Sequence, residues 1–366
     1  MGKIQRKKST EQAKKRAKEP AIIYEPVLFL PTGSTRANLA MSDYPYGGYP
    51  MGKIINTIGD SHTGKTSLAL ASLAEAANMP EFDNHDLFFD DAEYASEFDI
   101  QHLFGNRAGD RITMPESPSE SVEEFFVNIL RMLDKKKPFI YLLDSLDALY
   151  SKEDEDRAAE LDKKIDTDED IAGSYGQGKP KTMSWMLRLI RSKIKKTNSM
   201  LNIVSQTRAN LGFGAKFKPK IRSGGNALDF YASIVFWLSV IKTHTVGPKG
   251  KTVAIGGDIE MNVTKNKITG KKRKAKFPLY DDYGLDDITS CLWYLKEMNV
   301  IGTAGAYIQP HEIFAPGKTE ETMYMSDLIT TIEKQNLEPR LIELVAEQWK
   351  VFEDSIKLSG RKRKYA

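Results

Sequence analysis

The feature that most restricts the fold is a glycine-containing run, Gly59-Asp60-Ser61-His62-Thr63-Gly64-Lys65-Thr66. An apolar segment that predicts a strand, 53–58, precedes it, and a segment with helical periodicity, 66–77, follows. Between a strand and a helix this pattern is typical of a P-loop, whose backbone N–H groups surround phosphates at a helix N-terminus. We therefore expect the whole run to bind a nucleotide, with Lys65 on the outer phosphates and the Thr66 hydroxyl on magnesium. The alternative is an ordinary glycine turn.

The rest of the chain alternates between segments that predict strands and segments that predict helices. Expected strands are 86–90, 139–143, 200–205, 234–242 and 258–265, and expected helices are 35–41, 121–135, 182–196, 326–335 and 340–357. Such alternation predicts an α/β fold with a mostly parallel central sheet and helices on both faces. We expect a short basic N-terminal arm over 1–30, the core over 31–300, and a small helical C-terminal region with a basic tail over 301–366.

Composition sets broad limits. The 366 residues are 40% hydrophobic, which is enough for one large core, and the net charge of +3 does not by itself indicate a nucleic-acid partner. The single cysteine, Cys291, has no intramolecular disulfide partner. No apolar run approaches the roughly 18 residues of a membrane span, and the basic arm lacks the apolar stretch of a secretory signal. We expect a soluble, cytoplasmic protein without a membrane partner.

Carboxylates follow two of the predicted strands. The apolar segment 139–143 ends at Asp144, which is placed to hold a magnesium shell together with Thr66. The segment 86–90 ends at Asp90 and is followed by Asp91 and Glu93. These three carboxylates lie near the edge of the sheet where ligands bind in α/β folds. One of these acids is expected to orient an attacking water, and the alternative is a solvated loop.

Two long segments, about 150–181 and 207–225, lack the pattern of core elements. Loops of this length inside a domain are usually functional or disordered. The second combines cations with aromatic rings, a mixture suited to single-stranded DNA, although a run of charge is often only a solvated face. The first contains an acidic stretch, 153–170, that we expect outside a DNA channel. The expected DNA-binding residues are Lys179, Lys181, Arg208, Phe213, Lys216, Phe217, Lys218, Lys220 and Arg222.

Several short motifs resemble those of the bacterial RecA and phage UvsX recombinases. They are Thr32-Gly33-Ser34, Asp91-Ala92-Glu93, Asp144-Ser145 and above all Gly224-Gly225-Asn226-Ala227-Leu228-Asp229-Phe230-Tyr231-Ala232-Ser233. The resemblance covers about residues 28–295. It implies a RecA-like core that uses ATP and Mg²⁺, with Glu93 as the base that activates water.

The same resemblance implies further roles. Gln206 would sense the γ-phosphate and relay it to the second loop, or alternatively cap its strand. Lys265 and Lys267 would reach the γ-phosphate of a neighbouring subunit, or else face solvent or DNA with the basic run that follows. Phe98 takes the place of the adenine-stacking tyrosine. The basic tail differs from the usual acidic end of the bacterial family and favours a phage-type member.

The function that the resemblance implies is homologous recombination and repair. The chain would form a helical filament with itself on single-stranded DNA, pair it with homologous duplex DNA and catalyse strand exchange, helped by single-strand-binding and loader proteins. The alternatives are a ring-shaped hexameric helicase or motor, and a recombination mediator that does not hydrolyse ATP. The C-terminal region either guides duplex DNA or is a disordered tail.

Overall fold

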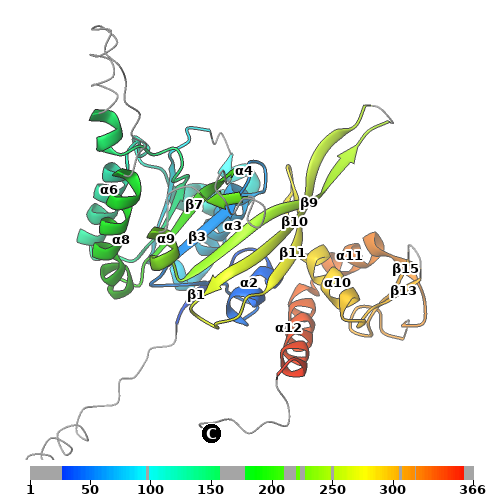
Figure 1. The fold of residues 1–366 in the computed structure, drawn as a ribbon. Helices are drawn as coiled ribbons and strands as arrows, with labels where there is room; N and C mark the ends of the chain where they lie inside the picture. The colour runs from blue at the N-terminus through cyan, green and yellow to red at the C-terminus, as the bar shows by residue number, and fades with distance from the viewer. Residues whose placement is uncertain are drawn as a thin grey trace, which may run out of the picture.

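The computed structural model describes residues 27–95, 99–156, 178–209, 220–222, 227–248, 251–304, 307–317 and 319–357. Its main sheet has the strand order β12-β11-β10-β9-β3-β7-β6-β4-β5, and β8 pairs with β7 beside this path (Figure 1). These strands are β3 (Ile54–Gly59), β4 (Asp86–Asp91), β5 (Ile112–Thr113), β6 (Phe139–Asp144), β7 (Met200–Ala209), β8 (Lys220–Arg222), β9 (Ile234–Val246), β10 (Val253–Asn266), β11 (Lys274–Tyr280) and β12 (Gly284–Leu285). A separate pair, β1 (Phe29–Leu30) and β2 (Tyr49–Pro50), lies at the start of the described chain.

Along the run β9-β3-β7-β6-β4-β5 each strand is parallel to the next, which confirms the predicted mostly parallel sheet. Each predicted core strand is present, within a few residues of its expected bounds. The strands β9 and β10 are longer than expected and form an antiparallel hairpin that projects beyond the core (Figure 1). The long hairpin extends the sheet on the side where β11 and β12 follow.

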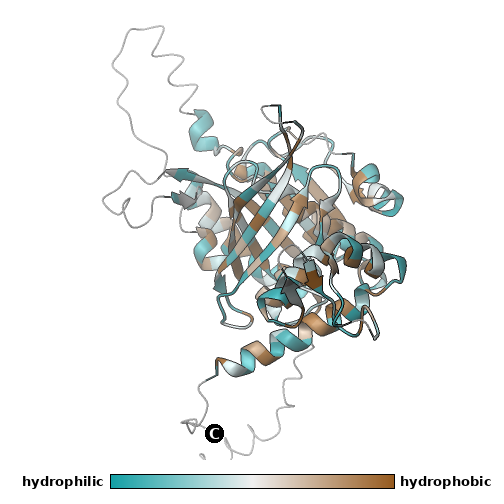
Figure 2. Cartoon of the chain, turned by 90° about the vertical axis from the view of Figure 1, so that its right-hand side faces the viewer, coloured by the Kyte–Doolittle hydropathy of each residue, from teal (hydrophilic) through white to brown (hydrophobic). Residues whose placement is uncertain are grey.

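Helices cover the sheet on both faces, because the central strands are apolar in both directions. Ile140 and Leu142 of β6 face one core cluster, whereas Phe139, Tyr141 and Leu143 face the other. In Figure 2, brown hydrophobic segments alternate with white and teal segments along the visible strands of the sheet. The helices are α2 (Thr35–Ser42), α3 (Lys65–Asn78), α4 (Ile100–Phe104), α5 (Asn106–Arg111), α6 (Val122–Asp134), α8 (Gly178–Lys196), α9 (Ala227–Tyr231), α10 (Asp287–Glu297), α11 (Met325–Lys334) and α12 (Glu338–Ser355), with a 3-10 turn, η1 (Pro80–Phe82).

Helix α6 illustrates how the sequence sets one of these elements. The Ser121 side chain accepts a hydrogen bond from the Glu124 backbone N–H, and the Glu124 side chain accepts one from the Ser121 N–H, so the first turn carries a capping box. Buried Phe125, Ile129 and Met132 recur at helical spacing along one face. That face packs in the same core cluster as buried residues of α8.

The C-terminal region contains the two expected helices, α11 and α12, and also a small sheet that the sequence analysis did not predict. Its three strands are β13 (Gly302–Ala304), β14 (Tyr307–Gln309) and β15 (Met323–Tyr324). Strands of two or three residues are too short to show the alternating pattern on which strand prediction depends. The region is therefore a mixed α and β unit, and its basic tail lies outside the described residues.

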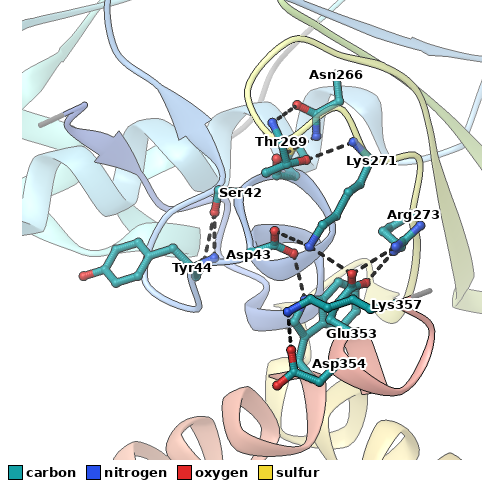
Figure 3. A network of polar contacts seen from close by, with 12 residues as sticks. Ser42, Asp43, Tyr44, Asn266, Thr269, Lys271, Arg273, Glu353, Asp354 and Lys357 are labelled. Carbon is teal, nitrogen blue, oxygen red and sulfur yellow. Dashed lines mark hydrogen bonds and ion pairs between the residues drawn. The ribbon is translucent and has the colours of Figure 1, made fainter. Parts of the chain in front are cut away.

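Helix α12 is attached to the core by a polar cluster that we call the α12 clamp: Asp43, Lys271, Arg273, Trp349 and Glu353. Figure 3 labels four of these residues, Asp43, Lys271, Arg273 and Glu353. Glu353 accepts from Arg273 Nε at 2.5 Å and Nη2 at 3.0 Å, and lies 2.9 Å from Lys271 Nζ. Lys271 also pairs with Asp43 at 2.6 Å, and the Trp349 indole N–H donates to Asp43 at 3.0 Å. The clamp joins α12 to the end of α2 and to the turn between β10 and β11.

Across the described part of the chain, no helix is both long enough and apolar enough to cross a membrane.

Candidate nucleotide site and DNA-binding hairpin

The glycine run forms a tight turn between β3 and α3, as predicted. A Cβ atom on Gly59 would lie 2.3 Å from Thr63 Oγ1, and one on Gly64, whose φ is +77°, would lie 2.3 Å from Leu279 Cδ2. Both positions therefore require glycine. The Asp60 carbonyl accepts from Thr63 Oγ1 at 2.8 Å and from Lys65 Nζ at 2.6 Å, which holds the turn closed.

A pocket of about 350 Å³ opens beside this turn. Its polar end is lined by Lys65 and Thr66, and its other walls come from Phe104 of α4, Leu279 of β11 and Leu285 of β12. A polar end and an apolar end suit the phosphates and the base of a nucleotide. The sequence does not indicate Phe104 and Leu279 as pocket residues, since nothing in its pattern shows that α4 and β11 meet at the P-loop. Phe98, its candidate for stacking on adenine, lies outside the described residues.

Thr66 and Asp144, the two residues predicted to share a magnesium shell, are in contact. The Thr66 hydroxyl donates to Asp144 Oδ2, and only 4% of Asp144 is exposed. Burial raises the pKa of Asp144 to about 6. Burial also lowers the pKa of Lys65, while the nearby carboxylates of Asp144 and Glu93 act in the opposite direction. A hydroxyl and a carboxylate beside a lysine are groups that fit Mg²⁺ and a phosphate chain.

Glu93 lies between the nucleotide site and β7. Its Oε1 atom accepts from the Ser145 hydroxyl and from Gln206 Nε2, the latter at 2.8 Å. The Glu93 backbone N–H donates to the Asp144 carbonyl at 3.2 Å, because β4 and β6 end side by side. The structure thus brings together Glu93, Asp144 and Gln206, which are far apart in the sequence.

Asp90 has a different environment from Glu93. It is fully buried, and its carboxylate accepts from Tyr141 Oη at 2.5 Å and from Ser119 Oγ at 2.6 Å. The alternative of a solvated loop is therefore wrong for Asp90, whose carboxylate instead connects β4 to β6 and to the segment before α6.

The second long segment begins as part of a β-hairpin formed by β7 and β8, so the predicted start of the loop at 207 is wrong. Its predicted end at 225 lies outside the described residues. Strand β7 continues to Ala209 and pairs with β8, with Thr207 opposite Arg222 and Ala209 opposite Lys220. Antiparallel pairing with β8 extends β7 beyond the main sheet. Arg208 lies 3.8 Å from Asp147, whose other oxygen accepts from the Gln206 backbone N–H at 2.6 Å. Phe213, Lys216, Phe217 and Lys218 lie outside the described residues, and Arg222 is described for its backbone alone.

The first long segment ends earlier than expected, because α8 begins at Gly178 rather than at 182. Lys179 and Lys181 therefore belong to the helix. The Lys179 ammonium donates to the Leu149 carbonyl, and burial lowers its pKa, whereas Lys181 is exposed. Most of the acidic stretch lies outside the described residues.

Lys265 and Lys267 lie at the end of β10 beside α9. Lys265 donates to the Asp229 carbonyl, and Lys267 donates to the Phe230 carbonyl at 3.0 Å. Their role toward a neighbouring subunit stays a prediction. The alternative that the whole basic run after Lys267 faces solvent or DNA is wrong, because Lys271 and Arg273 belong to the α12 clamp.

Comparison with known proteins gives one consistent family. The model of the RecA N-terminal domain matches residues 20–286. Protein RecA of Ehrlichia ruminantium (strain Gardel) is 25% identical over 308 residues, covering 83% of this chain and 78% of that protein. Protein RecA of Syntrophus aciditrophicus (strain SB) is 28% identical over 333 residues, covering 87% and 88%. Protein RecA of Geobacter metallireducens is 28% identical over 282 residues, covering 76% and 74%.

Proposed function

Because this chain belongs to the RecA family, we propose that it is an ATP-dependent recombinase that forms filaments on single-stranded DNA and catalyses homologous pairing and strand exchange. The observation that carries the proposal is the hydrogen bond from Gln206 to Glu93. Gln206 lies at the point where β7 leaves the sheet for the β7–β8 hairpin. One side chain therefore joins the carboxylate beside the nucleotide site to the segment proposed to bind DNA.

In this proposal the P-loop binds the phosphates of ATP, and Thr66 and Asp144 hold Mg²⁺. The bound metal would neutralise charge on the phosphate oxygens, as in other P-loop proteins. Lys65 adds a second positive charge, and the glycines at 59 and 64 leave room for the backbone to approach. The apolar walls around Phe104 and Leu279 would exclude water from the base.

Glu93 is proposed as the base that activates the attacking water. Its carboxylate is held by two donors, Ser145 and Gln206, so its position and its rotamer are defined. A carboxylate that accepts a proton from water must lie within hydrogen-bond reach of it. The Gln206 amide can donate its hydrogen bond to a phosphate oxygen of the nucleotide in place of Glu93. Such a change of partner would alter the conformation of the hairpin when the nucleotide binds.

The proposed DNA contacts are cationic. Arg208 and Lys220 are exposed cations on the hairpin, and exposed cations track a phosphate backbone. Lys265 and Lys267 are proposed to act on the nucleotide of the next subunit, so that hydrolysis depends on assembly. Single-strand-binding and loader proteins, and a phage-type origin, are further parts of this proposal.

Electron microscopy with single-stranded DNA and a slowly hydrolysed ATP analogue tests the proposal, together with a strand-exchange assay between a circular single strand and a homologous linear duplex. Open helical filaments and exchanged products are expected. Closed rings with unwinding of duplex DNA would instead identify a hexameric helicase. Binding to a recombinase without ATP hydrolysis would identify a mediator.

A further inference from the structure

The strand register places the P-loop directly beside the base of the hairpin formed by β7 and β8, which is called the hairpin below. In the parallel pair β3–β7, Gly59 is opposite Gln206, so the next residues, Asp60 and Thr207, leave the sheet together. Strand β7 then pairs with β8, which puts Lys220 opposite Ala209, two residues after Thr207. Because side chains alternate along a strand, Gln206 and Thr207 point to opposite sides of the hairpin.

Each side of the hairpin contacts a different part of the nucleotide site. On one side Gln206 donates to Glu93. On the other side the Thr207 hydroxyl donates to Asp60 Oδ1, and the Lys220 ammonium donates to Asp60 Oδ2. The hydrogen bonds from Lys220 and then Thr207 lower the pKa of Asp60.

The backbone of Asp60 is engaged at the same time. Its carbonyl oxygen accepts from Lys65 Nζ at 2.6 Å and from Thr63 Oγ1 at 2.8 Å. Asp60 thus contacts the phosphate-binding lysine through its carbonyl and the hairpin through both carboxylate oxygens.

We propose that Asp60 is a positioning residue that couples nucleotide binding to DNA binding through Thr207 and Lys220, in addition to the path through Gln206. The inference rests on the proposed function, since it needs ATP in the pocket and DNA on the hairpin. A phosphate that attracts Lys65 competes with the Asp60 carbonyl for the same ammonium. Likewise, a DNA phosphate competes with the Asp60 carboxylate for Lys220. If ATP binding moves Asp60, the availability of Lys220 to DNA therefore changes. If DNA binding moves Asp60, the availability of Lys65 to the ATP phosphates changes in the same way.

The expected size of this coupling follows from the solvent exposure of the ion pair between Lys220 and Asp60. The side chains of Lys220 and Asp60 are 55% and 43% exposed, and an ion pair in that setting is worth a small free energy. It corresponds to about a twofold to fivefold change in the coupling between the two ligands. Coupling is reciprocal, so ATP and DNA must affect each other's affinity by the same factor.

The test measures the affinity for labelled oligo(dT) by fluorescence anisotropy, at fixed salt, with ADP and with a slowly hydrolysed ATP analogue. The ratio of the two affinities is the coupling. Asp60→Asn should reduce this ratio by about twofold to fivefold relative to wild type. The matched control is Asp86→Asn, which breaks an ion pair with Lys137 at the other end of the parallel strands and should keep the wild-type ratio.

Two further variants, Lys220→Gln alone and Lys220→Gln combined with Asp60→Asn, test whether Asp60 acts through Lys220. If Asp60 acts through Lys220, Asp60→Asn should have no further effect on the ratio in a Lys220→Gln background. An unchanged ratio in Asp60→Asn, or fully additive effects in the double variant, would overturn the inference while the proposed function stands. A wild-type protein whose oligo(dT) affinity is the same with both nucleotides would overturn the proposed function itself, and the inference with it.

Discussion

Replacement of Glu353 by glutamine should destabilise the protein by about 2 kcal/mol. The carboxylate is the centre of the α12 clamp, and its side chain is 9% exposed while Arg273 and Lys271 are 25% and 32% exposed. Removing one partner of a fully buried pair costs about 3–5 kcal/mol, because the other charge is left without compensation. Here both cations keep access to water, which reduces the expected loss.

Urea unfolding followed by circular dichroism measures this loss, and Glu343→Gln on the same helix is the matched control. Glu343 pairs with Arg340, but their side chains are 51% and 67% exposed, so its loss should be about 0.5 kcal/mol or less. Hydrogen bonds from Arg273 lower the pKa of Glu353, so the advantage of the wild type should disappear as the pH falls below about 4. Equal stability of the two variants would refute the reasoning.

Other predictions concern the site and the pH dependence of folding. Glu93→Gln should bind ATP and DNA but hydrolyse ATP at least about 100-fold more slowly in a turnover assay. Its filaments on DNA should therefore last longer than those of wild type, and faster disassembly would contradict the role of Glu93 as the base. Lys65→Ala and Lys267→Ala should each abolish DNA-stimulated ATP turnover, and mixing them should restore part of it; normal mixed filaments without recovery would exclude a shared site. Burial raises the pKa of Asp287 to about 6, and a carboxyl with a raised pKa stabilises the folded state less as the pH rises from about 4 to about 6. Urea unfolding of Asp287→Asn should lack this fall, which amounts to at most about 2 kcal/mol because the side chain keeps some contact with water, and an identical pH profile would count against it.

The core strands and helices could be predicted because their signals are local. The run before Gly59, the run that ends at Asp144 and the capped helix α6 each carry their own periodicity or capping residues. The parallel order of the strands then brings the ends of β3, β4 and β6 to one edge, which is why Thr66, Glu93 and Asp144 could be grouped from the sequence.

The features that the sequence did not predict depend on contacts between distant segments. Nothing near Asp60 indicates that Thr207 and Lys220 will reach it, since that contact depends on the register of β3 against β7 and of β7 against β8. Leu279 reaches Gly64 only because β11 is added to the far side of the sheet. The extension of β7 past residue 207 was missed for a similar reason, because its pairing partner β8 has three residues.

The position of Leu279 and Leu285 in the wall of the nucleotide pocket also affects the order of events during synthesis. The P-loop leaves the ribosome more than two hundred residues before β11 and β12 do, as their positions at 59–66 and 274–285 require. Early nascent chains therefore have the phosphate-binding turn without the apolar wall. Domains tend to fold as units during synthesis, so the complete pocket forms after most of the core has emerged. A ribosome-bound chain that stops before residue 274 should bind ATP poorly, which delays nucleotide-dependent assembly until each subunit is nearly complete.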